Sequence, residues 1–78
     1  MREAVALLNG GDSAGAARAL RAFLARYPGD GRAEDASYLL VVALRRSGDA
    51  AGAREAARTY LARYPSGFRR SEVEALAR

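Results

Sequence analysis

Apolar residues recur along this chain with the spacing of an α-helix rather than the strict alternation of a strand. Between residues 12 and 27 they are spaced at i, i+4, i+7, i+8 and i+11, which places them on one helical face. This first set consists of Ala16, Leu20, Phe23, Leu24 and Tyr27. A second set with the same spacing consists of Ala53, Ala57, Tyr60, Leu61 and Tyr64. Both segments are predicted to be amphipathic helices, with the three tyrosines in the core.

Glycine and proline mark where the helices begin and end. Pro28 and Pro65 should end the two amphipathic helices, because a residue that precedes proline is disfavoured in the α region. Asp12 or Ser13 is a candidate N-cap, and Ser71 with Glu74 three residues later has the pattern of a capping box. The pattern predicts five helices and no convincing strand. The helices are expected at about residues 3–9, 13–27, 32–47, 50–64 and from 71 to the C-terminus.

Two stretches of the chain are nearly the same. Residues 11–28 read GDSAGAARALRAFLARYP, and residues 48–65 read GDAAGAREAARTYLARYP. Tyr27 and Tyr64 occupy the same place in these stretches and are 37 residues apart. A repeat of this length filled with helical pattern indicates a stacked helical array rather than a compact enzyme fold.

Each of these stretches resembles the second half of a tetratricopeptide repeat. The matching positions in the first are Gly11, Asp12, Ala16, Leu20, Leu24 and Pro28, and those in the second are Gly48, Asp49, Ala53, Ala57, Leu61 and Pro65. The ending aromatic-Leu-x-x-Tyr-Pro is similar to the variant in bacterial cell-envelope proteins, such as the Tol-Pal-associated coordinator and the outer-membrane assembly lipoprotein. The chain departs from the family where Phe23 and Tyr60 replace the usual small residue, and in its longer period.

The resemblance implies an all-α fold, a tetratricopeptide-like array of antiparallel helical hairpins with about two repeats. We expect a single domain over residues 1–78, with repeat units at about 1–28 and 32–65 and a C-terminal capping helix at about 69–78. Arrays of this kind generally need about three repeats and polar end caps for stability. The chain is therefore expected to be a fragment of a longer protein or to associate with itself.

Composition excludes several classes of enzyme. The 78 residues contain no cysteine, histidine or lysine, and all thirteen basic residues are arginine. The usual nucleophile–histidine pairs and zinc ligand sets are therefore impossible, as are a lysine Schiff base and a phosphate-binding loop with lysine. Glu34 and Asp35, like Glu72 and Glu74, fall in predicted first helical turns, where carboxylates favour the helix dipole. We expect no enzyme activity, no catalytic residue, no cofactor and no metal.

A protein or peptide partner is what the resemblance implies, bound in a groove on the first helix of each repeat. The candidate contact residues are Val5, Asn9, Asp35, Tyr38, Val42, Arg45 and Arg46. Tyr38 and Val42 are four residues apart and share a helical face, so together they could form an apolar anchor beside arginine. The competing interpretation is that both side chains only pack against a neighbouring helix.

Two other functions stay open. The net charge of +4 allows a basic nucleic-acid-binding domain that uses Arg45, Arg46, Arg69 and Arg70, although arginines interleaved with acids make this reading weaker. The chain could instead be a structural segment that forms a homo-oligomer. No segment approaches the ~20 apolar residues of a membrane span, and no signal peptide is visible. The expected location is the bacterial periplasm or cell envelope if a longer parent is exported, and otherwise the cytoplasm.

Overall fold

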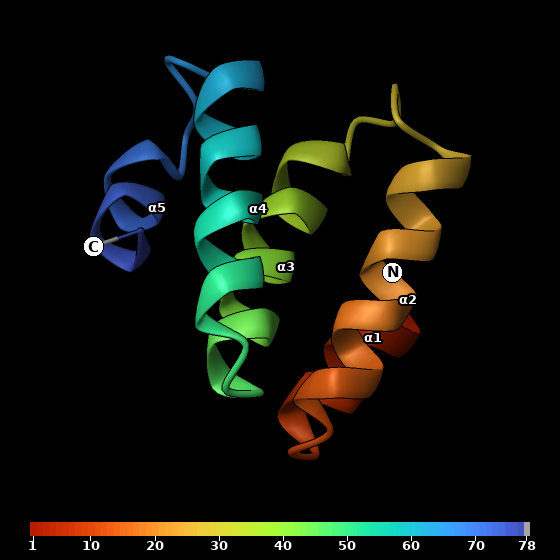
Figure 1. Cartoon of the computed structure of the whole chain (residues 1–78). Helices are drawn as coiled ribbons and strands as arrows, with labels where there is room; N and C mark the ends of the chain where they lie inside the picture. Colours follow the sequence, from red (N-terminus) through yellow and green to blue (C-terminus); the bar gives the residue numbers. More distant parts are fainter. Residues whose placement is uncertain (78) are drawn as a thin grey trace.

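The computed structural model describes residues 1–77, which form five α-helices and no strand (Figure 1). The helices are α1 (Arg2–Asn9), α2 (Ser13–Arg26), α3 (Ala33–Arg46), α4 (Ala50–Arg63) and α5 (Arg70–Leu76). Each helix packs against the next one in the chain, and α3 contacts α2, α4 and α5. In Figure 1, α3 lies behind α2 and α4, with α5 on the far side of α4. The predicted all-α array of helical hairpins is confirmed.

The repeated Gly-Asp pairs build the same turn twice. Gly11 and Gly48 have φ angles of 92° and 89°, a left-handed conformation in which glycine avoids the strain of a Cβ atom. The aspartate that follows each glycine accepts a hydrogen bond at the start of the next helix. Asp12 Oδ1 accepts from the Gly15 amide at 2.8 Å, and Asp49 Oδ1 accepts from the Gly52 amide at 2.8 Å. The two segments thus share this sequence because the same Gly-Asp turn and aspartate N-cap begin the second helix of both hairpins.

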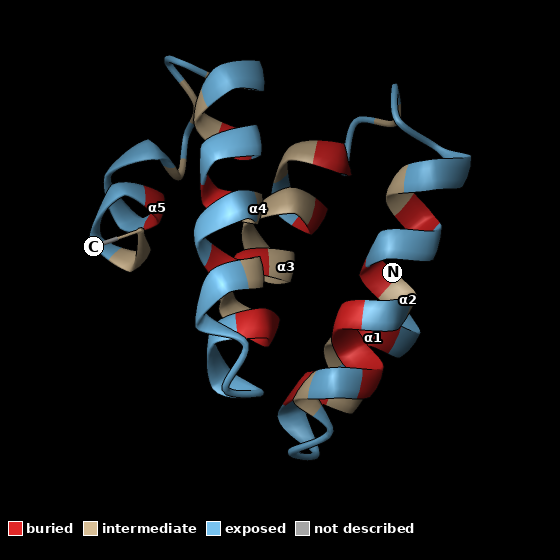
Figure 2. Ribbon diagram, in the orientation of Figure 1, coloured by how far each residue is buried: buried red, intermediate tan, exposed pale blue. Residues whose placement is uncertain are grey.

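Small residues form much of the main core. Ala16, Ala36, Ala43 and Ala53 are all at most 1% exposed, and they lie between α2, α3 and α4. Alanine at such contacts lets helix axes approach toward the low end of the usual ~8–10 Å separation. Larger side chains, with Leu20 the most deeply buried, fill the remaining space. In Figure 2 the buried residues lie on the inward faces of α1 to α4.

A second, smaller core holds α5 against the rest of the molecule. It consists of Val41 from α3, Ala57 and Tyr60 from α4, and Val73 from α5, each at most 1% exposed. Because α3 contributes to both cores and contacts α2, α4 and α5, it is the central helix of the array.

Two details of the sequence interpretation are wrong. Arg69 occupies the N-cap of α5 and makes no side-chain capping bond, so Ser71 lies inside the helix and forms no capping box. Glu74 instead pairs with Arg70 at 3.6 Å. Tyr27 is 46% exposed rather than core and is the C-cap residue of α2, whereas Tyr64, the C-cap residue of α4, is half-buried against the second core. Tyr60 is buried as expected.

Candidate functional site

A groove runs between α3 and α5. Its volume is about 470 Å³, and its lining residues are Tyr38, Val42, Arg45 and Arg46 from α3 and Glu72, Ala75 and Leu76 from α5. We refer to it as the α3/α5 groove. The four lining residues from α3 are all among those singled out in the sequence, so the structure brings these four together.

The floor of the groove is apolar and one end is cationic. Tyr38 and Val42 lie one helical turn apart and are both half-buried. At the C-terminal end of α3, Arg45 Nη1 donates a hydrogen bond of 2.8 Å to the carbonyl oxygen of Leu76. That carbonyl belongs to the last turn of α5 and has no partner within its own helix. Arg46 is exposed beside it, so this end can meet an anionic group.

Stacked cationic and aromatic groups lie next to Tyr38 and Glu72, outside the residues that line the groove. The Arg69 guanidinium lies over the Tyr38 ring at 4.7 Å from its centroid, and 5.5 Å from the centroid of the Phe68 ring. Arg69 Nη1 also donates to Glu72 Oε2 at 2.9 Å, and this bond raises the pKa of the guanidinium. Phe68 is 84% exposed, an unusual exposure for an aromatic side chain beside a groove.

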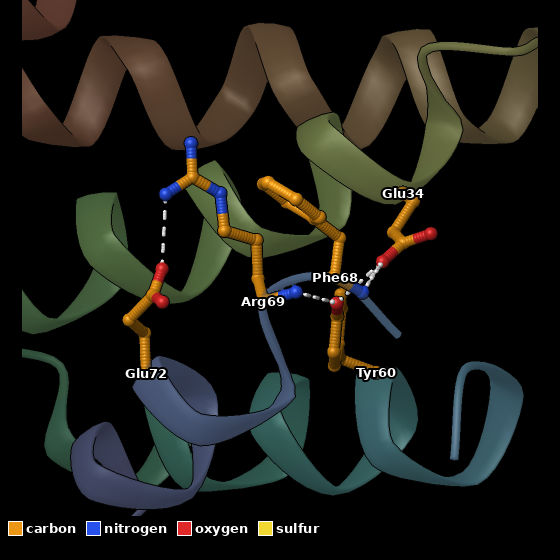
Figure 3. Close-up of polar contacts among 5 residues, drawn as sticks. All are labelled: Glu34, Tyr60, Phe68, Arg69 and Glu72. Atoms are coloured by element: carbon orange, nitrogen blue, oxygen red, sulfur yellow. Dashed lines mark hydrogen bonds and ion pairs between the residues drawn. The ribbon is translucent and has the colours of Figure 1, made fainter. Parts of the chain in front are cut away.

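A hydrogen-bond network centred on Tyr60 holds α5 in position (Figure 3). The Tyr60 hydroxyl donates to Glu34 Oε2 at 2.7 Å and accepts from the Arg69 amide at 2.9 Å. The same Glu34 oxygen accepts from the Phe68 amide at 2.6 Å. These bonds, which we call the Tyr60 network, join α3, α4 and the turn before α5. They fix the turn from which Arg69 and Phe68 reach the groove.

In the first repeat, different residues hold the corresponding turn before the next helix. Phe23, which has no hydroxyl, stands 37 positions before Tyr60, and Asp30 stands 37 positions before Gly67. There Asp30 Oδ1 accepts from the Arg32 amide at 2.8 Å, and Arg32 is the counterpart of Arg69. The tyrosine hydroxyl of the second repeat therefore replaces an aspartate side chain. A Cβ atom at Gly67 would lie 2.6 Å from that hydroxyl, so the exchange also requires glycine.

Burial and, second to it, the hydrogen bond to Glu34 together raise the pKa of Tyr60 from 10.0 to about 12. Both effects favour the neutral phenol, because ionisation would place a second negative charge beside the Glu34 carboxylate. The hydroxyl is therefore a donor throughout the neutral pH range.

Three predicted contact residues lie outside the groove. Val5 is half-buried on α1, Asn9 is exposed at the end of α1, and Asp35 is exposed in the first turn of α3. None of them lines the α3/α5 groove. The sequence interpretation also missed the α5 side, which comprises Glu72, Ala75 and Leu76. The 37-residue period of the repeat could have identified two of these residues, because Glu72 and Ala75 lie 37 positions after Asp35 and Tyr38.

Within residues 1–77, no group of three or more His, Cys, Asp or Glu side chains is placed to hold a metal ion. No helix in the same part of the chain has the length and apolar character needed to cross a membrane.

Comparison with known proteins agrees with the fold. A family model described as the tetratricopeptide repeat matches residues 1–68. No curated protein and no solved structure matches the chain. The family match covers both copies of the repeated Gly-Asp to Tyr-Pro stretch and the turn that leads into α5. The chain belongs to the tetratricopeptide repeat family.

Proposed function

We propose that this chain is a non-enzymatic interaction module that holds a peptide or a helix of a partner protein in the α3/α5 groove. The observation that carries the proposal is that Tyr38, Val42, Arg45 and Arg46 line one hollow together with residues of α5. Membership of a family of interaction scaffolds supports it.

The groove favours a ligand with an apolar residue next to an acidic one. The apolar residue would lie on the Tyr38 and Val42 side chains, and its carboxylate neighbour would meet Arg46. Burial of an aliphatic side chain contributes ~1.5–3 kcal/mol, which is enough to place one anchor but not to give tight binding alone. A charge pair at the exposed Arg46 adds ~0.2–1 kcal/mol and mainly sets the direction of the ligand.

Two of the four arginines that would form a nucleic-acid surface already have acidic partners. Arg69 pairs with Glu72 at 2.9 Å, and Arg70 pairs with Glu74 at 3.6 Å. Arg45 donates to a carbonyl oxygen of α5. These contacts support a protein ligand over a phosphate backbone.

The setting that we propose is the bacterial cell envelope, on the strength of the aromatic-Leu-x-x-Tyr-Pro endings alone.

Selection from a random peptide library displayed on phage tests the groove directly. Peptides enriched on the immobilised chain would be synthesised with a fluorophore, and their affinity measured by fluorescence anisotropy. We expect enriched peptides to combine an apolar residue with Asp or Glu, and Arg46→Glu to weaken their binding at least five-fold.

Arg2→Glu is the matched control, because it changes the net charge equally from an exposed position on α1 that lines neither the groove nor any other hollow described for this chain. It should alter the affinity less than two-fold. Equal losses in the two variants, or no enrichment over an empty surface, would refute binding in the groove.

A further inference from the structure

Positive charge in this chain is concentrated on two helices. Of the charged residues, α2 contains only three arginines, and α4 contains three arginines and one glutamate. These helices therefore carry net charges of +3 and +2. The whole chain carries +4, so all remaining residues together carry −1. The excess positive charge lies on the second helix of each hairpin, outside the α3/α5 groove.

The two basic helices flank a hollow of their own. α2 and α4 flank α3 in Figure 1, and residues of all three helices line a hollow of about 210 Å³. Its lining comprises Arg21, Leu24, Ser37, Leu40, Gly52, Glu55, Ala56, Thr59 and Tyr60. On α3, Ser37 and Leu40 point to the side opposite Tyr38 and Val42, as the 100° advance per residue requires. This hollow and the α3/α5 groove are thus separate sites.

Arginines around the hollow have no acidic partner. Three ion pairs occur within residues 1–77, and none involves a residue of α2 or α4. Arg21 lines the hollow, and Arg18 and Arg58 lie one helical turn from the lining residues Arg21 and Glu55. All three arginines and Glu55 are exposed. Arg63 Nη2 donates to the Pro28 carbonyl oxygen at 2.9 Å and so bridges the far ends of the two helices. An array of unpaired arginines over an apolar hollow is complementary to an acidic ligand with an apolar anchor.

We propose that this α2/α4 face binds an acidic amphipathic helix of another protein. A leucine of that helix packs in the hollow against Leu24, Leu40 and Ala56. Glutamates or aspartates of the same helix pair with Arg18, Arg21 and Arg58. The hollow has room for about one aliphatic side chain, which makes a helix with a narrow apolar stripe the fitting partner.

Two features of the hollow favour a protein over a nucleic acid. The one aromatic residue in its lining is Tyr60, which is 1% exposed and cannot stack on a base. Glu55 stands among the arginines, and a nucleic acid carries a charge at every phosphate that would be repelled there. A peptide can place a neutral residue opposite Glu55 and its acidic residues opposite the arginines.

The probe for this face is a fluorescent, helix-forming peptide of glutamate, alanine and leucine with its leucines on one side. Its affinity would be measured by anisotropy for the native chain, for the double variant Arg21→Glu/Arg58→Glu, and for Arg45→Glu/Arg46→Glu. Both double variants change the net charge by the same amount, but the second one alters only the α3/α5 groove. We expect at least a ten-fold loss for the first and less than a two-fold loss for the second.

The apolar part of the proposal has its own test. Thr59 lines the hollow and is exposed, so Thr59→Phe should fill the space without disturbing the core. We expect it to weaken the probe at least three-fold, and replacing leucine by alanine in the probe should do the same. Equal losses in the two charge variants would overturn the proposal, as would an undiminished affinity in Thr59→Phe. Tighter, Arg21-dependent binding of a single-stranded RNA or of phosphatidylglycerol vesicles would overturn it as well.

Discussion

Removing one oxygen atom from Tyr60 should loosen the attachment of α5. Tyr60→Phe keeps the ring in its buried position and deletes the hydroxyl, which donates to Glu34 Oε2 at 2.7 Å and accepts from the Arg69 amide at 2.9 Å. In this variant the Arg69 amide, which lies in a part-buried turn, loses its acceptor. Glu34 retains its hydrogen bond from the Phe68 amide, so the carboxylate is not left without a donor.

The expected cost follows from these two bonds. A neutral hydrogen bond contributes ~1 kcal/mol net, and one to a charged group contributes ~1.5–3 kcal/mol. Together they give an expected loss of about 2.5–4 kcal/mol in the free energy of unfolding. A domain of this size has a total stability of about 4–12 kcal/mol, so the loss is a large share of it. The corresponding fall in melting temperature is about 10–30 °C.

Urea unfolding followed by circular dichroism measures the loss, and amide hydrogen exchange shows where it acts. Tyr64→Phe is the matched control, since the Tyr64 hydroxyl lies one turn along α4 and takes no part in the Tyr60 network. We expect exchange in α5 to accelerate more than exchange in α2. A loss below 0.5 kcal/mol, within the usual range for surface changes, would refute the assigned role of the network. Uniform acceleration across all helices would refute it too.

Three further predictions concern the same packing. Gly67→Ala would place a Cβ atom 2.6 Å from the Tyr60 hydroxyl and should cost ~1–3 kcal/mol in urea unfolding, whereas Gly29→Ala, with open space around it, should be nearly neutral. The pKa of Tyr60 is raised to about 12, so its contribution to stability is fully present below pH 10, where tyrosine ionises in the unfolded chain. That contribution should be lost as the pH rises through 12, and phenolate absorbance that is missing in Tyr60→Phe should appear over the same pH range. Ala53→Leu, at a position 1% exposed, should lower stability by ~1–3 kcal/mol, while Ala51→Leu on the exposed side of α4 should change it little.

Most of the fold could be predicted from local signals. The i, i+4, i+7 spacing, the Gly-Asp turns and the Tyr-Pro ends identify the helices to within about a residue at most ends. Tyr27 is the informative failure, because it has the same spacing as Tyr64 but is 46% exposed, whereas Tyr64 is half-buried against the second core. The N-cap of α5 is another failure, because the predicted capping box of Ser71 and Glu74 does not form. It depends on the Arg69 amide meeting a hydroxyl nine residues earlier, a tertiary contact with no local pattern.

The candidate site was only half predictable for a related reason. Tyr38 and Val42 share a face by spacing alone, and the family resemblance pointed to the helix that carries them. The α5 side could be found only by applying the repeat offset across the turn. Phe68 follows no periodic pattern, and its position is set by Glu34 and Tyr60, residues 34 and 8 positions away.

Chemical-shift mapping tests the central claim most directly. The backbone amide resonances of the isotope-labelled chain would be followed during titration with a peptide enriched from the random library. The account predicts the largest shifts at Tyr38, Val42, Ala75 and Leu76, with α1 and the outer side of α2 unchanged. Shifts centred on α1, or spread evenly over the five helices, would contradict binding between α3 and α5.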